Sequence, residues 1–201
     1  FAKKQGAPKE FVEDLNSITT PSTTGKLTTP DVLLKEGKIK DISRNLEVIF
    51  TPGHDISEIS IYDPSSKIIF SGDHILPRIT PFIPIHDEET SMLNHYVDSL
   101  NKMKSFEHTK IAPGHFEMID NPQNRVEQIL LHHEKRSEKI INILKDGELT
   151  GWEVTKKLFS RPLDAMNLRL AFQETMAHLK YIESQGKIKQ KVSEVNTWSL
   201  T

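Results

Sequence analysis

Short apolar segments separated by turn residues dominate the middle of the chain. LEVIF (46–50), EISIYD (58–63) and KIIFS (67–71) are rich in β-branched and aromatic residues and are bounded by turn residues. This pattern is typical of strands. The Asp-Pro-Ser-Ser sequence at 63–66 predicts a hairpin between the second and third segments. HTKIAP (108–113) predicts one further short strand.

Apolar residues at helical spacing predict three helices around these strands. The segments are 8–18, a helix that Asp87 caps and that runs through Met103, and Asn121 to Lys145. Asn121-Pro122 favours a helix start because the side chain caps the backbone and proline fits the first turn. The segments 19–30 and 76–86 are rich in proline and other turn residues and are predicted to be loops.

The organisation changes after Gly147. Thr150-Gly-Trp-Glu153 fits a capping box that opens a short helix, and a longer helix follows Arg161-Pro162. KIKQKV and NTWSL then predict two strands. Helix, helix and hairpin in this order outline a winged helix. We therefore predict an α+β protein with one domain of residues 1–146 and a small winged-helix domain of residues 147–201.

Composition narrows the class of protein. Of the 201 residues, 36% are hydrophobic and 27% are charged, which is a globular mixture, and the net charge of −2 gives no overall reason to expect a nucleic-acid partner. The chain has no cysteine, so a metal would need His and carboxylate ligands. No apolar run approaches the roughly 18 residues of a membrane span, and no signal peptide is visible, so we expect a cytoplasmic protein without a membrane partner.

Three residues with metal-binding chemistry stand in similar surroundings. His54, Asp73 and His115 each end a short apolar segment and each lie beside glycine. Glycine allows a sharp turn and a close approach of the backbone to a ligand. Imidazole nitrogens and a carboxylate that can bridge two cations suit Zn²⁺, and also Mn²⁺ or Fe²⁺. This pattern predicts a metal site; the alternative is three polar turn residues at a sheet edge.

The motifs TPGHDISEISIYD, IIFSGDHIL and IAPGH resemble the later metal-binding motifs of the metallo-β-lactamase superfamily, in particular its glyoxalase-II-like branch with a C-terminal winged helix. The resemblance implies an αβ/βα sandwich and a hydrolase with one or two metals, with two Zn in a complete site. It implies that His54 is a ligand of the first metal, that Asp73 bridges, and that His115 is a ligand of the second.

Two departures from the family pattern shape our expectations. Glu58 stands where the family usually has a second histidine, four positions after His54. The principal motif, His-x-His-x-Asp-His, occurs nowhere in the 201 residues. We therefore expect the chain to be the C-terminal portion of the sandwich and to hold about half a metal site. A partner, either the N-terminal half of the sandwich or a second copy, should cover the apolar face of its strands; the alternative is a chain that has lost the activity.

Other polar residues have both a functional and a structural interpretation. His74 follows Asp73 directly and is predicted to act in catalysis, by orienting substrate or by donating a hydrogen bond to a metal ligand, or to be a loop histidine. Arg78 is predicted to hold an anionic group of the substrate, or to be a solvated surface residue. His132 and His133 are predicted to lie on a helix surface, and His178 to be structural.

The leading functional hypothesis is a metal-dependent hydrolase. Metal-activated hydroxide would attack an ester-, thioester- or lactone-like carbonyl or a phosphodiester, and the chain alone would be catalytically incomplete. The rival is a non-catalytic module that binds RNA or DNA through its winged helix. Lys187, Lys189 and Lys191 alternate along one predicted strand and so share a face that could meet phosphates.

Overall fold

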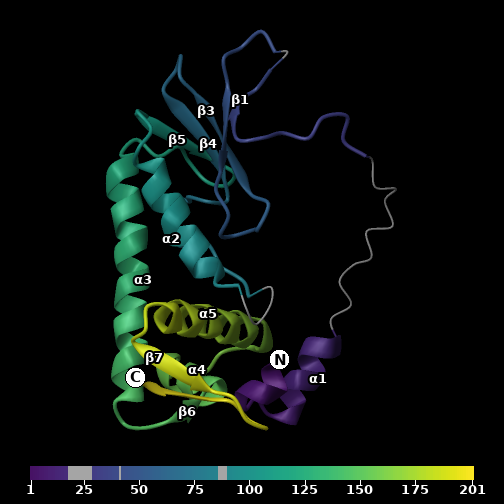
Figure 1. The fold of residues 1–201 in the computed structure, drawn as a ribbon, viewed down its shortest axis with the longest axis vertical. Coiled ribbons are helices and arrows are strands. Elements are labelled where there is room, and N and C mark those ends of the chain that lie inside the picture. Colours follow the sequence, from purple (N-terminus) through teal and green to yellow (C-terminus); the bar gives the residue numbers. More distant parts are fainter. Residues whose placement is uncertain (18–28, 41, 86–89) are drawn as a thin grey trace.

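The computed structural model describes residues 1–17, 29–40, 42–85 and 90–201. Within these residues a five-stranded sheet with helices on one face lies above a smaller unit that contains three strands (Figure 1). The fold is α+β, as predicted. The predicted cap residue Asp87 and most of the predicted loop 19–30 lie outside the described residues.

The larger sheet contains the strands that the apolar segments predicted. Its strands are β1 (Gly37–Lys38), β2 (Glu47–Phe50), β3 (Ile59–Asp63), β4 (Ile68–Gly72) and β5 (Lys110–Pro113), in this order across the sheet. Neighbours up to β4 pair antiparallel, whereas β4 and β5 pair in parallel. Parallel neighbours end at the same edge of a sheet, so the residues that follow β4 and β5 come together.

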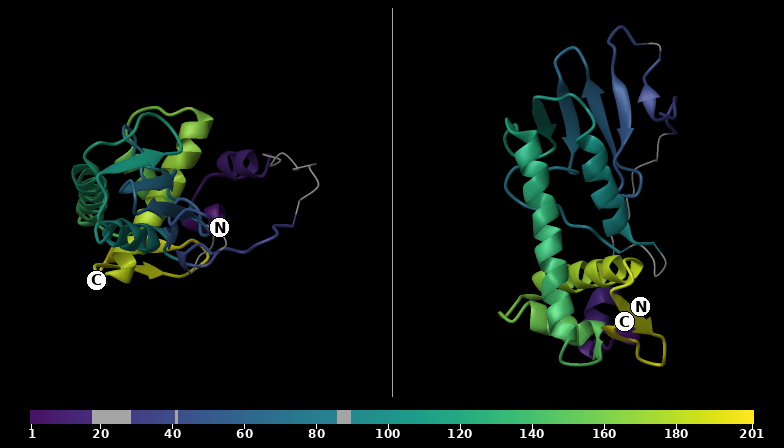
Figure 2. Two further views of the ribbon diagram at one scale, coloured as in Figure 1. Left: turned by 90° about the horizontal axis from the view of Figure 1, so that it is seen from above. Right: turned by 60° about the vertical axis from the view of Figure 1, so that its left-hand side comes forward.

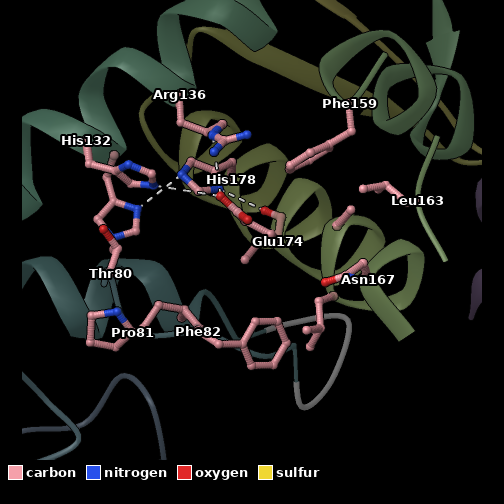
Figure 3. A pocket seen from close by; sticks show the side chains of 15 residues that line it. Thr80, Pro81, Phe82, His132, Arg136, Phe159, Leu163, Asn167, Glu174 and His178 are labelled. Atoms are coloured by element: carbon pink, nitrogen blue, oxygen red, sulfur yellow. Dashed lines mark hydrogen bonds and ion pairs between the residues drawn. The ribbon is translucent and has the colours of Figure 1, made fainter. Parts of the chain in front are cut away.

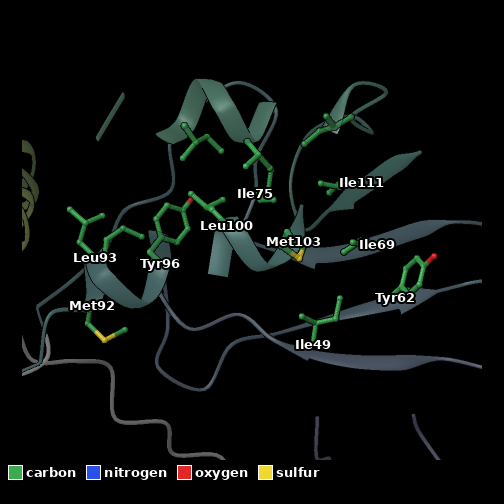
Figure 4. Close-up of a cluster of buried hydrophobic side chains, with 14 residues drawn as sticks. Ile49, Tyr62, Ile69, Ile75, Met92, Leu93, Tyr96, Leu100, Met103 and Ile111 are labelled. Carbon is green, nitrogen blue, oxygen red and sulfur yellow. The ribbon is translucent and has the colours of Figure 1, made fainter. Parts of the chain in front are cut away.

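Two helices cover one face of this sheet. They are α2 (Met92–Met103) and α3 (Pro122–Leu144), and Figure 2 shows both on the same side of the strands. Alternate strand residues point toward them. The fully buried Ile49, Ile69 and Ile111 pack with Tyr96 and Leu100 of α2 (Figure 4). Burying an aliphatic side chain of this size is worth roughly 1.5–3 kcal/mol, so this face holds the sheet and helices together.

The opposite face of the sheet is partly uncovered. Phe50 at the end of β2 is 42% exposed and Phe70 of β4 is 47% exposed. Phe70 pairs across the sheet with Ile61 and with Ala112, so these apolar side chains share one face. Large apolar groups gathered on a sheet face mark a surface that a partner can cover.

The smaller unit has the predicted order of helix, helix and hairpin. It consists of β6 (Leu149–Thr150), α4 (Gly151–Leu158), α5 (Ala165–Ser184), β7 (Ile188–Lys191) and β8 (Thr197–Leu200), with the sheet order β6-β8-β7. The capping box is confirmed: the Thr150 side chain accepts the backbone N–H of Glu153, and the Glu153 side chain accepts the backbone N–H of Thr150. The short strand β6 was not predicted.

The smaller unit has a hydrophobic core of its own, the second core, and residues from both ends of the chain contribute to it. The 3₁₀ helix η1 (Ala2–Gln5) and helix α1 (Lys9–Ser17) lie against the smaller unit. Phe11 packs its ring 5.4 Å from that of Phe172, and the indole N–H of Trp198 donates to Oε1 of Gln5 at 3.0 Å. Helix α3 joins the two cores, because its first half contributes to the core of the larger sheet and its last turns to the second. The boundary at 146/147 stays a prediction.

No helix among the described residues is long and apolar enough to cross a membrane.

Candidate metal centre

The structure brings His54, Asp73 and His115 together at one end of the larger sheet. His54 lies in the connection from β2 to β3, Asp73 directly follows β4, and His115 comes two residues after β5. Nε2 of His54 lies 3.9 Å from Oδ2 of Asp73, and Nε2 of His115 lies 3.5 Å from Oδ1. Each carboxylate oxygen therefore faces its own imidazole.

Glycine permits the close approach of the two strand ends. The N–H of Gly114 donates to the carbonyl of Gly72 at 2.7 Å. A Cβ on Gly114 would lie 3.0 Å from Oδ1 of Asp73 and 3.2 Å from the Gly72 carbonyl oxygen, and Gly72 itself has a φ of +55°. A side chain at position 114 would push against the carboxylate, and one at position 72 would strain the backbone.

A backbone carbonyl orients the ring of His54. Nδ1 lies 2.7 Å from the carbonyl oxygen of Phe82. A carbonyl only accepts, so Nδ1 carries the proton of the neutral ring and Nε2 keeps its lone pair toward Asp73. Metal-binding histidines are usually held in this way by a hydrogen bond from the other ring nitrogen.

Glu58 holds the backbone of Asp73 through a hydrogen bond. Its Oε1 accepts the backbone N–H of Asp73 at 3.1 Å, whereas Oε2 is buried and has no hydrogen-bond partner among the described residues. Burial raises the pKa of Glu58 to about 7, with nearby His54 acting in the opposite direction. The sequence pattern gave Glu58 no role; its only signal was the spacing of four residues from His54.

The donors fit a metal in kind and supply part of a coordination shell. Two imidazoles and a carboxylate are the ligand types that Zn²⁺, Mn²⁺ and Fe²⁺ accept. Oδ1 of Asp73 is buried and accepts no hydrogen bond within the described part of the chain, so it is available to a cation. Across the described ranges, however, no group of three or more His, Asp or Glu side chains is arranged to hold an ion by itself. A structural or catalytic Zn²⁺ needs about four ligands, so further ligands are required.

His74 points into the core and away from solvent. Its side chain is fully buried, its ring lies 5.0 Å from that of Tyr96 in an edge-to-face contact, and Tyr96 donates its hydroxyl to the His74 carbonyl at 2.8 Å. Burial lowers the pKa of the ring to about 3. Neither ring nitrogen is hydrogen-bonded to another described residue. The catalytic role of His74 stays a prediction.

Arg78 lies on the surface and is already paired. Its Nη2 is 2.9 Å from Oε2 of Glu117, its Nε also donates to this carboxylate, and its guanidinium lies 5.9 Å from the centre of the Phe116 ring. The hydrogen bond to Glu117 raises the pKa of Arg78. An anionic substrate would compete with Glu117 for this side chain, so its role in substrate binding also stays a prediction.

The prediction that both histidines of the 132–133 pair lie on a helix surface is wrong for His133. His133 is 3% exposed, and its Nδ1 lies 3.1 Å from Nε2 of His178 on α5. Helix α3 is covered on two sides, by α2 and by α5, so it has a wider buried surface than its apolar stripe indicates. His132 is partly exposed, 3.8 Å from Glu174.

Sequence comparison identifies the class of proteins to which this fold belongs. The family model of the metallo-beta-lactamase superfamily matches residues 9–115, and a model described as the metallo-beta-lactamase-like C-terminal domain matches residues 138–199. The chain therefore belongs to the metallo-beta-lactamase superfamily, whose members are generally hydrolases that bind metal ions. The expected superfamily membership is confirmed.

Individual relatives agree with this assignment. The chain is 32% identical over 155 residues to a beta-lactamase-like protein 2 homolog of Caenorhabditis elegans, which covers 76% of this chain and 50% of that protein. It is 26% identical over 160 residues to a probable metallo-hydrolase of Bacillus subtilis, covering 77% and 50%. The chain thus spans about half the length of these curated relatives.

Solved structures show the same fold over the whole chain. A metallo-beta-lactamase family protein of Thermus thermophilus is 26% identical with a TM-score of 0.77, covering 99% of this chain and 62% of that one. A beta-lactamase domain protein of Burkholderia ambifaria is 21% identical with a TM-score of 0.88, covering 100% and 60%.

Proposed function

We propose that this chain carries part of the metal centre of a metal-dependent hydrolase that cleaves an ester-type carbonyl substrate. The observation that carries the proposal is the Asp73 carboxylate with an imidazole at each oxygen, His54 at 3.9 Å and His115 at 3.5 Å. Membership of a superfamily of hydrolases supports it. The chemistry of this site, rather than the fold, is what favours hydrolysis.

The chain's own residues position the metal ligands. His54 and His115 would bind through Nε2, and Asp73 would offer both of its oxygens. The Phe82 carbonyl holds the His54 ring, and Glu58 holds the backbone of Asp73. When bound, Zn²⁺, or Mn²⁺ or Fe²⁺, would lower the pKa of a bound water and polarise the substrate carbonyl. We propose two Zn in the complete site.

A thioester or ester is the substrate class that similarity favours. The chain is 27% identical over 101 residues to an atrochrysone carboxyl ACP thioesterase of Aspergillus fumigatus, covering 50% of this chain and 30% of that protein. Such a protein cleaves an acyl thioester, in which attack on a carbonyl produces an oxyanion. Hydrolysis of a lactone or a phosphodiester also passes through a negatively charged state. These compounds are therefore suitable to compare with thioesters and esters as substrates.

The remaining ligands come, in this proposal, from whatever covers the open face of the sheet. The curated relatives are about twice as long as the matched region, and Phe50 and Phe70 are exposed on that face. We propose a further β-layer or a second copy of the chain as the partner. A cytoplasmic location is proposed on the composition alone.

The helix-helix-hairpin unit is proposed to be a winged helix of the glyoxalase-II-like branch. It follows the sandwich directly, and α5 lies close to the segment that holds His54. The rival nucleic-acid function gains no support from its lysine face. Lys191 lies 3.7 Å from Glu148, so one of the three lysines is already paired with a carboxylate.

The proposal is tested by the metal content and thioester hydrolysis of the intact protein. Asp73→Asn should lower the content of Zn, Mn or Fe, measured by elemental mass spectrometry, and should lower kcat/KM by at least about 100-fold, because a bridging carboxylate is lost. Asp98→Asn, which changes an exposed carboxylate on α2, is the matched control and should keep both at wild-type values. Unchanged metal content and activity in Asp73→Asn would refute the proposal.

A further inference from the structure

Tyr96 contacts the chain beside two of the predicted metal ligands. It lies on α2 and is fully buried (Figure 4). Its hydroxyl donates to the backbone carbonyl of His74 at 2.8 Å, and its ring lies 5.0 Å from the His74 ring in an edge-to-face contact. Because His74 directly follows Asp73, these contacts fix the backbone on one side of the carboxylate ligand.

Tyr96 also lies against the residue that precedes His54. A Cβ on Gly53 would lie 2.7 Å from Cβ and 2.9 Å from Cα of Tyr96, which is closer than real Cβ atoms approach their neighbours. Glycine at position 53 therefore allows the turn before His54 to lie directly on the backbone of α2. The start of the His54 loop is set by the place of Tyr96 in the helix.

A second side chain of α2 holds the same turn. Ser99 is 3% exposed, and its hydroxyl donates to the carbonyl of Pro52 at 2.9 Å. Ser99 comes three residues after Tyr96, a spacing that places both side chains on one face of the helix. This face of α2 thus contacts two consecutive residues of the turn, Pro52 and Gly53.

The hydrophobic core fixes α2 from its first residue to its last. Four further side chains of the helix are buried in the core of the larger sheet, namely Met92, Leu93, Leu100 and Met103. A binding site of this kind must be held within about 0.5 Å of its working geometry, and residues on a rigid element do this better than residues on loops. α2 is such an element.

The other contacts that hold these ligands are less buried, and each holds one ligand. The Phe82 carbonyl accepts the hydrogen bond from the His54 ring at 2.7 Å. Phe82 is half-buried and lines a cavity of about 370 Å³ between α3, α5 and residues 80–83 (Figure 3). Glu58, which accepts the N–H of Asp73, is also half-buried. Tyr96, by contrast, is fully buried and contacts the chain beside both ligands.

We propose that Tyr96, together with Ser99, positions the metal centre by setting the spacing between His54 and Asp73 before a metal binds. The Tyr96 ring fixes the backbone before His54, and its hydroxyl fixes the backbone after Asp73. The importance of this spacing for metal binding rests on the proposed function. The order that α2 gives to the two loops does not depend on a metal.

Tyr96→Phe is the first variant, because it removes only the hydroxyl and leaves the ring against Gly53. The zinc affinity of the intact protein, measured by competitive titration, should fall by about tenfold, as for other changes that misorient a ligand. Tyr62→Phe is the matched control. The Tyr62 hydroxyl donates to the carbonyl of Glu107 at 2.7 Å, near the end of β3 that lies away from His54. This variant loses the same kind of hydrogen bond and should keep the wild-type zinc affinity.

Amide hydrogen exchange, measured by NMR without metal, is the second readout. The N–H of Asp73 donates to Glu58, and the N–H of His74 donates to the carbonyl of Ser71 at 3.0 Å. Both amides should exchange about fivefold faster in Tyr96→Phe than in Tyr62→Phe, as expected when the loss of one net hydrogen bond eases local opening.

Ser99→Ala is the second variant and keeps the proposal testable if Tyr96→Phe fails to fold. It should weaken zinc binding, whereas Ser137→Ala, which removes a hydroxyl bonded to the carbonyl of His133 on α3, should not. Wild-type zinc affinity in both Tyr96→Phe and Ser99→Ala would overturn the positioning role.

The two readouts separate this inference from the proposed function. A wild-type protein that binds no zinc would reject the proposed function, and amide exchange would then decide the role of Tyr96. Faster exchange at Asp73 and His74 in Tyr96→Phe would keep that role. Equal exchange rates in the two tyrosine variants would overturn it.

Discussion

At the scale of the residue, the site depends on a glycine at position 114 as much as on the metal-binding side chains. Gly114 has no Cβ, and this lets the end of β5 lie against both Gly72 and the Asp73 carboxylate. The Asp73 carboxylate then lies between the two imidazoles. The Glu58 side chain accepts the backbone N–H of Asp73, and the Phe82 carbonyl accepts the hydrogen bond from the His54 ring. Small displacements at position 114 are therefore transmitted directly to a predicted metal ligand.

Gly114→Ala should weaken metal binding by about tenfold, the lower end of the range for changes that misorient a ligand. The new Cβ would lie 3.0 Å from Oδ1 of Asp73, so the carboxylate must move by a few tenths of an ångström. The measurement is a competitive zinc titration of the intact protein. Gly186→Ala introduces backbone strain at a distant turn with φ of +70°, and it should cost stability without changing metal affinity. Wild-type affinity in Gly114→Ala would refute this interpretation.

The buried histidine pair should make stability depend on pH. Burial lowers the pKa of His178 from 6.5 to about 4 and that of His133 to about 2, with Arg136 and His132 adding to the effect and Glu174 opposing it for His178. As the pH falls below 6.5 the unfolded chain therefore takes up these protons before the folded chain does. Their contribution to stability is complete above pH 6.5 and is lost progressively as the pH falls, toward pH 4 for His178 and toward pH 2 for His133.

His178→Leu tests this pH dependence. Removing one proton-binding group should reduce the slope of unfolding free energy against pH by up to about 1.4 kcal/mol per pH unit between pH 4.5 and 6. The slope is obtained from urea denaturation at several pH values. Leu179→Ala, at a buried position of the same helix, should lower stability at every pH and keep the wild-type slope. Equal slopes in all three proteins would contradict the assigned protonation states.

At the scale of the element, local patterns predicted the longer strands and the α-helices, but not the two-residue strands β1 and β6 or the 3₁₀ helix η1. β2, β3 and β4 follow from β-branched runs between turn residues, and the capping box at Thr150 predicted the start of α4. Contacts between distant segments were not predicted. The packing of η1 and α1 on the second core and the burial of His133 depend on residues far away in the sequence, and periodicity within a segment carries no information about them.

The proximity of the predicted metal ligands depends both on local sequence patterns and on contacts between distant segments. Glycine beside His54, Asp73 and His115 indicated three loop sites of similar character. Their actual proximity depends on the parallel pairing of β4 with β5 across the intervening α2, which no single motif encodes. Arg78 shows the limit of motif-based reasoning, since its partner Glu117 lies 39 residues away.

Thr150→Ala should destabilise the protein by about 1 kcal/mol, the typical cost of losing an N-cap. The change removes the acceptor for the N–H of Glu153 and the hydroxyl that donates to the Glu153 carboxylate. Urea denaturation at pH 7 measures the effect. Lys157→Ala changes an exposed residue of the same helix and should stay within about 0.5 kcal/mol of the wild type. An equally small effect at position 150 would show that the capping box contributes little.

At the scale of the whole molecule, the two faces of the larger sheet differ in what covers them. α2 and α3 bury one face, whereas Phe50 and Phe70 remain 42% and 47% exposed on the other. The curated relatives extend over about twice the matched length. We propose that a layer packed on this face covers Phe50 and Phe70 and also supplies the metal ligands that the described residues lack.

The 201-residue chain by itself should associate through this face. Phe70 pairs with the partly buried Ile61 and Ala112 in the sheet, and Phe50 and Phe70 are 42% and 47% exposed on this face. Hiding apolar surface of this kind gains about 25 cal/mol per Å². Sedimentation velocity over a range of concentrations should show dimers or larger species. Phe50→Lys combined with Phe70→Lys should shift the population to monomer, because two charges on the face oppose its burial. Met166→Lys, at a 61% exposed position of α5 in the other unit, should leave the association unchanged. A wild-type chain that is monomeric at all concentrations would show that the open face needs no partner, and the additional metal ligands would then have to be sought elsewhere.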